Sequence, residues 1–140
     1  MSVYKNDNPI FLKKSLESIY DNQTVKPDEI IVVFDGPLTK EQLEILQDFK
    51  EGKEKIVHYY PQKQNRGLGA ALQVGLKKCR NEFIARMDSD DISSSTRFEK
   101  QLNFINEHPD IDIFSGNIQE FSGTIENKKG IRKVPTHERD

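Results

Sequence analysis

Cysteine is nearly absent from this 140-residue sequence, which contains Cys79 alone and no tryptophan. A single thiol excludes an internal disulfide and a zinc cage built from cysteines, and it is typical of a reducing compartment. No apolar run reaches the ~18 residues that a membrane-spanning helix needs, and the polar residues 5–8 interrupt any signal peptide. We therefore expect a cytoplasmic protein, with peripheral contact at the inner face of the cell membrane left open.

An excess of either charge is also lacking, because 21 Lys and Arg residues stand against 23 Asp and Glu residues, for a net charge of −2. Domains that bind nucleic acid usually carry a broad basic surface, so we expect no nucleic-acid partner. Any site for an anion must be local. The apolar residues make up 34% of the chain and fall in periodic clusters, which favours a globular fold over disorder.

Short apolar runs alternate with segments of helical periodicity along the chain. We predict strands at Met1–Tyr4, Glu29–Phe34, Ile56–Tyr60, Phe83–Met87 and Asp112–Ser115. Helical stripes lie between them, as in the run that carries Leu12, Leu16 and Ile19. This alternation predicts an α/β fold with a mostly parallel sheet and helices on both faces. Ligands of such sheets bind beyond the carboxyl ends of the strands.

The densest cluster of acidic residues, Asp88-Ser89-Asp90-Asp91, directly follows the fourth predicted strand. Carboxylates this close repel one another, which raises their pKa values unless a cation neutralises them. Mg²⁺ and Mn²⁺ prefer oxygen ligands, and Mg²⁺ usually combines one or two carboxylates with substrate phosphates. The cluster therefore indicates a site for a divalent metal and a diphosphate, although Asp and Ser are also common in plain turns and helix starts.

Two further motifs fall on the predicted ligand side of the sheet. Asp35-Gly36 ends the second strand, where a carboxylate can accept hydrogen bonds from a base or a sugar hydroxyl; alternatively, it is an ordinary turn. The segment Asn65-Arg66-Gly67-Leu68-Gly69 opens a helix, so that glycine backbone and Arg66 could meet a phosphate. This segment is neither a Walker motif nor a dinucleotide fingerprint, and an ordinary helix entry explains it equally well.

Taken together, these motifs resemble a family 2 glycosyltransferase of the GT-A fold. The resemblance rests on residues 2–7, residues 32–37, residues 65–72, and residues 85–91 followed by residues 97–101, whose order and spacing match over nearly the whole chain. It is nearest to bacterial enzymes that build capsules, exopolysaccharides or lipopolysaccharides. It implies a Rossmann-like GT-A nucleotide-sugar-binding domain over residues 1–122. We expect residues 123–140 to form a polar hairpin or loose tail that leads to an acceptor-binding region outside the chain.

The resemblance also implies a role for individual residues. Asp35 matches the aspartate that contacts the nucleobase, usually uracil, while Phe34 replaces the acidic residue often found before it. Tyr4 falls in the stretch that lines the base pocket, and Arg66 and Gly67 fall in the loop near the nucleotide. Asp88 and Asp90 match the pair of aspartates that contacts the ribose and the metal-bound diphosphate. Asp91 could be a further ligand of the metal.

The implied reaction is an inverting, Mg²⁺- or Mn²⁺-dependent transfer of sugar from a nucleotide-diphosphate donor, with UDP expected, to a glycan or lipid-linked acceptor. The family's general base comes from a later region, and Glu120 and Glu126 carry no recognisable motif. The first strand is also short and the chain stops without a final element, so we expect a fragment without its catalytic base. The alternatives are a sugar-nucleotide-forming nucleotidyltransferase, disfavoured by the glycine-free loop after the first strand, and a non-catalytic nucleotide-binding fragment.

Overall fold

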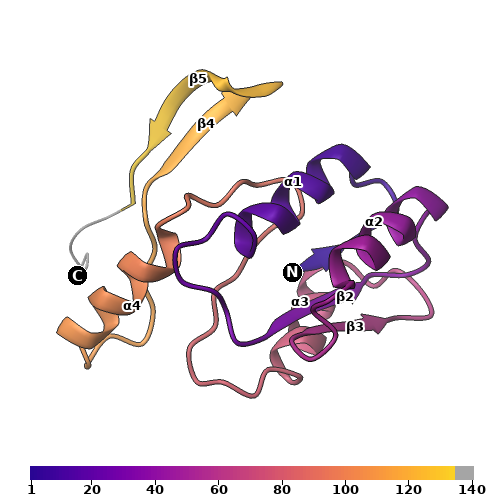
Figure 1. The fold of residues 1–140 in the computed structure, drawn as a ribbon, viewed down its shortest axis with the longest axis horizontal. Coiled ribbons are helices and arrows are strands. Elements are labelled where there is room, and N and C mark those ends of the chain that lie inside the picture. The colour runs from indigo at the N-terminus through magenta and orange to yellow at the C-terminus, as the bar shows by residue number, and fades with distance from the viewer. Residues whose placement is uncertain (135–140) are drawn as a thin grey trace. The chain divides into compact units, whose positions relative to one another are not determined.

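The computed structural model describes residues 1–134 of the chain, and Figure 1 shows their course. The chain divides into two compact units, one covering Met1–Asn103 and the other beginning at Phe104. This division lies before residue 122, where the sequence suggested that the nucleotide-binding domain ends. The first unit contains every residue that we predicted to belong to the site.

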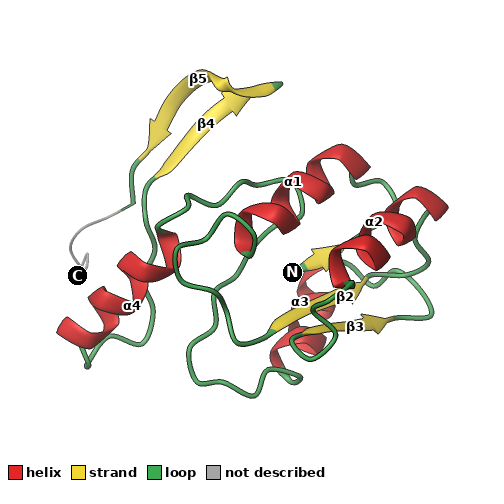
Figure 2. Cartoon of the chain, viewed as in Figure 1, coloured by secondary structure: helices red, strands yellow, loops and turns green. Residues whose placement is uncertain are grey.

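A three-stranded parallel sheet forms the centre of the first unit. Its strands are β1 (Ser2–Val3), β2 (Ile30–Phe34) and β3 (Val57–Pro61), in the spatial order β1-β2-β3. All five residues of β2 are buried, as expected for the middle strand of a sheet covered on both faces. Figure 2 shows the strands side by side among helices. Because all three run parallel, their carboxyl ends meet at one edge of the sheet.

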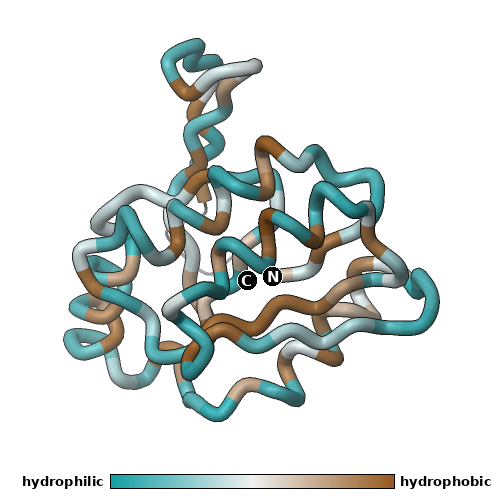
Figure 3. The backbone as a smooth tube through the Cα atoms, turned by 45° about the vertical axis from the view of Figure 1, so that its right-hand side comes forward, coloured by the Kyte–Doolittle hydropathy of each residue, from teal (hydrophilic) through white to brown (hydrophobic). Residues whose placement is uncertain are grey.

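Helices cover both faces of this sheet, which confirms the α/β prediction. Helices α1 (Pro9–Ile19) and α2 (Lys40–Lys50) pack against one another, and their apolar residues share a core with Ile30, Val32 and Phe34. The alternate residues of β2 form a second cluster with Ala71 of α3 (Leu68–Leu76). The period-2 pattern of a strand thus divides β2 between two helical layers, and Figure 3 shows the hydrophobic centre that results.

The starts of the first two helices follow the capping rules that the sequence indicated. The side chain of Asn8 accepts hydrogen bonds from the first turn of α1, with Pro9 in that turn. Thr39 and Gln42 form a complete capping box at the start of α2. These caps fix the points at which the loops after β1 and β2 end, so they also fix the edge of the sheet where the site lies.

Two of the predicted strands are wrong. Residues 83–87 form an irregular segment in which Met87 joins the core, whereas Phe83 and Ile84 are 54% and 49% exposed. The apolar pattern indicated burial, but a strand also needs a partner, and the outer strand β1 offers only two residues for pairing. Residues 112–115 are likewise irregular: Ile113 is 90% exposed, whereas Phe114 packs against the ring of Phe104.

The second unit contains an antiparallel hairpin of β4 (Ile118–Ser122) and β5 (Thr124–Arg132). Gly123 makes the turn at a φ of 74°, an angle that suits glycine. Helix α4 (Arg97–Glu107) crosses the boundary between the units. The sequence predicts a polar hairpin or a loose tail at residues 123–140. The hairpin in the structure begins at residue 118, and residues 135–140 lie outside the described residues. Among residues 1–134, no helix has the length and apolar character needed to cross a membrane.

Candidate functional site

The candidate site is formed by four segments at the carboxyl edge of the sheet. Three of them are residues 4–8 after β1, residues 35–38 after β2 and residues 62–67 after β3. The fourth is the acidic loop, which we define as residues 88–91. Parallel pairing brings the first three together, while a hydrogen bond from the Ser89 side chain to Asp7 joins the acidic loop to residues 4–8.

Asp35 connects the loop after β2 to the start of α3. Its side chain is buried, and its Oδ1 and Oδ2 atoms accept hydrogen bonds from the backbone N–H groups of Arg66 (2.8 Å) and Gly67 (3.0 Å). Asp35 is thus in direct contact with Arg66 and Gly67, which belong to the other motif predicted on the ligand side of the sheet. Each carboxylate oxygen has a second lone pair, so Asp35 can still accept a hydrogen bond from a ligand.

Gly36 allows these two loops to approach one another closely. Its φ is 90°, and a Cβ atom built there would lie 2.8 Å from the backbone nitrogen of Asn65 and 3.2 Å from the carbonyl carbon of Gln64. Both neighbours are backbone atoms, which cannot turn away as a flexible side chain can. The contact therefore requires glycine, and it explains why the Asp35-Gly36 pair is more than a generic turn.

The loop after β1 is organised by two residues that the sequence analysis did not select. Asp7 accepts a hydrogen bond from the backbone N–H of Tyr4 at Oδ2 (2.9 Å). The fully buried Gln42 donates from Nε2 to the carbonyl oxygens of Tyr4 (2.9 Å) and Asp7 (2.8 Å). The position of Gln42 in the capping box was visible in the sequence, but the inward direction of its amide was not.

Two hydrogen bonds hold the acidic loop. One joins it to the chain's first helix, and the other joins it to the loop before that helix. Ser15 of α1 donates from Oγ to the carbonyl oxygen of Asp88 (2.9 Å). Ser89, which is buried, donates from Oγ to Oδ2 of Asp7 (2.7 Å). The backbone of the loop is thus held, whereas Asp90 is exposed to solvent.

The segment that follows the acidic loop is held by buried neutral groups. Gln23 donates from Nε2 to the carbonyl oxygens of Ser18 and Ser94, at 2.7 Å each. Ser18 accepts a hydrogen bond from the backbone N–H of Ser93 at 2.9 Å, and Phe98 donates from its backbone to Oε1 of Gln23 at 3.3 Å. These bonds attach the chain between the acidic loop and α4 to the end of α1.

The charges around the acidic loop are partly compensated by arginines. Arg86 donates from Nη2 to both carboxylate oxygens of Asp88, at 2.9 and 3.1 Å. Arg97 donates to the carbonyl oxygen of Arg86 at 3.0 Å. Burial, followed by the charges of Asp90 and Asp88, raises the pKa of Asp91 above its usual value. The predicted repulsion between neighbouring carboxylates is therefore present.

Within residues 1–134, no group of three or more His, Cys, Asp or Glu side chains converges in a way that could hold a metal ion. Mg²⁺ is usually bound by one or two carboxylates, with the remaining positions taken by phosphate oxygens and water. Asp90 and Asp91 are the carboxylates that remain exposed.

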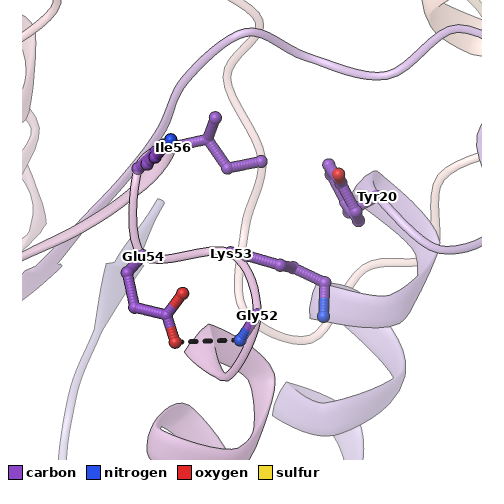
Figure 4. Close-up of a pocket in the computed structure, with 6 residues that line it drawn as sticks. Tyr20, Gly52, Lys53, Glu54 and Ile56 are labelled. Carbon is purple, nitrogen blue, oxygen red and sulfur yellow. Dashed lines mark hydrogen bonds between the residues drawn. The ribbon is translucent and has the colours of Figure 1, made fainter.

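A pocket of about 320 Å³ lies at the other edge of the sheet (Figure 4). It is lined by Tyr20, at the end of α1, and by residues 52–56, which lead into β3. Lys53 donates to the carbonyl oxygen of Phe49 and lies over the Tyr20 ring. None of the residues that we predicted to bind the donor lines this pocket, so the candidate site and the pocket are separate.

Comparison with known proteins identifies a family and several relatives. The model of the family described as "Glycosyl transferase family 2" matches residues 1–140. A UDP-Gal:alpha-D-GlcNAc-diphosphoundecaprenol beta-1,3-galactosyltransferase of Escherichia coli is 38% identical over 97% of this chain and 48% of its own length. The amylovoran biosynthesis glycosyltransferase AmsE of Erwinia amylovora is 32% identical over 100% of this chain and 51% of its own length.

The fold agrees with these relatives. The crystal structure of S. aureus TarS superposes with a TM-score of 0.64 and 25% sequence identity, over 77% of this chain and 19% of that chain. An uncharacterized glycosyltransferase of Haemophilus influenzae is 42% identical over 97% of this chain and 50% of its own length. The chain thus spans about half the length of the curated relatives it matches.

Proposed function

Because the chain belongs to glycosyl transferase family 2, we propose that it forms the donor-binding part of an inverting glycosyltransferase that uses a UDP-linked sugar. The observation that carries this proposal is the junction of the four segments at the carboxyl edge of the sheet. Asp35 is bonded to Arg66 and Gly67, and Ser89 of the acidic loop is bonded to Asp7 beside Tyr4. Ligands of open α/β sheets bind at this edge.

The proposed roles follow the order of groups in a nucleotide-diphosphate sugar. Tyr4 and Asp35 would contact the base, with the free lone pairs of the Asp35 carboxylate accepting an N–H group of uracil. Arg66 and Gly67 would lie near the nucleotide, where the exposed guanidinium of Arg66 can approach a phosphate. Asp88 and Asp90 would contact the ribose and the diphosphate with its metal.

A Mg²⁺ or Mn²⁺ ion fits the donor set of the acidic loop. Asp90 would hold the ion, together with Asp88 or Asp91, and the diphosphate would complete its coordination. When bound, such an ion stabilises the negative charge that develops on the departing diphosphate. Burial, followed by the charges of Asp90 and Asp88, raises the pKa of Asp91, and a divalent cation would relieve the part of this shift that comes from repulsion between carboxylates.

The acceptor in this proposal is a glycan or a lipid-linked sugar of a bacterial surface polysaccharide. The Escherichia coli relative is named for a lipid-linked acceptor, and AmsE is named for amylovoran biosynthesis. A lipid-linked acceptor would place the protein at the inner face of the cell membrane, in peripheral contact with it. We assign the general base to no residue of this chain, since the chain spans about half the length of these relatives.

Calorimetric titration with UDP in the presence of Mn²⁺ tests this function. We expect the wild-type chain to bind UDP and Asp90→Ala to lose most of the Mn²⁺-dependent affinity. Asp28→Ala is a matched control, because Asp28 is an exposed carboxylate that precedes β2 at the opposite edge of the sheet. If the wild-type chain binds no nucleoside diphosphate at any Mn²⁺ concentration, the proposal is wrong.

A further inference from the structure

Asp7 connects the two halves of the candidate site. One of its carboxylate oxygens, Oδ2, accepts hydrogen bonds from the backbone of Tyr4 at 2.9 Å and from the hydroxyl of Ser89 at 2.7 Å. Tyr4 lies in the segment assigned to the base, and Ser89 lies between the two aspartates assigned to the diphosphate. A single carboxylate oxygen is therefore bonded to both the segment assigned to the base and the acidic loop.

The position of Asp7 is itself fixed by a hydrogen bond from Gln42 of α2. Gln42 is fully buried and donates to the carbonyl oxygens of both Tyr4 and Asp7, while its Oε1 accepts from Thr39. All the polar atoms of this amide are thus used within the fold. The turn from Tyr4 to Asp7 is closed further by the hydrogen bond from the backbone of Asp7 to the carbonyl oxygen of Tyr4 at 2.9 Å.

Ser89 differs from its neighbours in the acidic loop. It is 8% exposed, whereas Asp88 is half-buried and Asp90 and Asp91 are exposed. A hydrogen bond to an ionised carboxylate is stronger and shorter than one between neutral groups, and the Ser89–Asp7 distance of 2.7 Å agrees with such a bond. The serine is thus held inward while the aspartates beside it remain accessible.

We infer that Asp7 and Ser89 are positioning residues of the donor site. Their hydrogen bond holds the acidic loop in the position from which its aspartates can contact a metal-bound diphosphate. This inference rests on the proposed function. Asp7 acts through Ser89, because its Oδ2 atom accepts hydrogen bonds from both the Tyr4 N–H and the Ser89 hydroxyl within the fold. The contribution of these residues to affinity consequently requires the metal.

The test measures UDP binding by ligand-observed NMR titration, with Mg²⁺ and again with EDTA, for the wild-type chain and five variants. Ser89→Ala and Asp7→Ala each remove the bond, and the double variant removes both partners. Asp7→Asn keeps an oxygen that can accept from Ser89. Ser94→Ala is the matched control, since Ser94 is an exposed serine a few residues beyond the acidic loop. Circular dichroism confirms that each variant is folded.

The bond between a hydroxyl and a carboxylate predicts a loss of about tenfold in Mg²⁺-dependent affinity for Ser89→Ala and Asp7→Ala. We expect the double variant to lose no more than either single variant, and Asp7→Asn to retain most of the affinity. With EDTA, the variants and the wild-type chain should bind alike. An equal loss with EDTA would reveal a general structural role and would overturn the inference.

Three other results also overturn the inference, and they are distinguishable from one another. Wild-type affinity in both alanine variants removes the positioning role but leaves the proposed function in place. A wild-type chain that binds no UDP, with or without Mg²⁺, removes the proposed function and the inference together. If Asp7→Asn binds as weakly as Asp7→Ala, the charge of Asp7 acts directly on the ligand and the positioning role is wrong.

Discussion

Replacing Gly36 by alanine should separate the two loops that meet beside Asp35. Gly36 and Gly52 both have positive φ angles, 90° and 73°, so an alanine is strained at either position. The two positions differ in their surroundings. A Cβ atom at Gly36 would lie 2.8 Å from the backbone nitrogen of Asn65, whereas a Cβ atom at Gly52 would meet nothing within 4 Å. Gly52→Ala is therefore the matched control for Gly36→Ala.

The difference between the two variants isolates the cost of the contact. Left-handed backbone costs an L-residue roughly 1–2 kcal/mol, and this cost is common to both. Forcing an extra methyl group into a filled space adds roughly 1–3 kcal/mol. For a domain of this size a loss of 1 kcal/mol lowers Tm by about 4 °C, so Gly36→Ala should melt about 4–12 °C below Gly52→Ala.

Thermal denaturation followed by circular dichroism measures this difference, and titration with UDP measures its effect on the site. Movement of Asn65 away from the loop after β2 would lengthen the hydrogen bonds from Arg66 and Gly67 to Asp35. Gly36→Ala should accordingly bind UDP more weakly than Gly52→Ala. Equal melting temperatures for the two variants would refute the close approach of the loops.

Three other substitutions test separate parts of the fold by urea denaturation. Asp35→Ala should lower the free energy of unfolding by roughly 2–4 kcal/mol, because two backbone N–H groups lose a charged acceptor; a loss below about 0.5 kcal/mol contradicts this. Gln42→Leu should cost roughly 2–4 kcal/mol by leaving the carbonyl oxygens of Tyr4 and Asp7 without this donor, and wild-type stability would contradict it. Asp91→Asn should stabilise the chain near pH 7, since the folded state raises the pKa of Asp91 and thus disfavours its charged form. That gain should disappear as the pH falls below the usual value of 3.8, where Asp91 is protonated in both states; a gain that persists in acid contradicts the assignment.

The features that the sequence predicted well are those that depend on nearby residues. The stripe of Leu12 and Leu16, the caps at Asn8 and Thr39, and the buried strand around Val32 all follow from local periodicity and local hydrogen bonding. The rule that ligands bind at the carboxyl ends of parallel strands then selected loops that do meet in the structure. The roles of Tyr4, Asp88 and Asp90 toward a ligand stay predictions.

The failures depend on pairing across the chain. The apolar character of Phe83 and Ile84 predicted a strand, but a strand also requires a partner edge, which no local pattern reveals. The contact between Asp7 and Ser89 joins residues 82 positions apart. Neither side chain has an unusual sequence context. Their bond therefore cannot be predicted from the sequence, and it is seen only in the folded arrangement of β1, α2 and the acidic loop.

The backbone on both sides of the acidic loop is supported largely by uncharged groups, namely the hydroxyls of Ser15 and Ser18 and the amide of Gln23. Dissolved ions screen attractions between exposed charges, but they have little effect on buried neutral hydrogen bonds. If the site binds a metal-bound nucleotide as proposed, raising the ionic strength should release that ligand before it disturbs the acidic loop. On this basis, a high-salt wash could elute the nucleotide from immobilised protein, and the protein could bind nucleotide again because the structure of the acidic loop is unchanged.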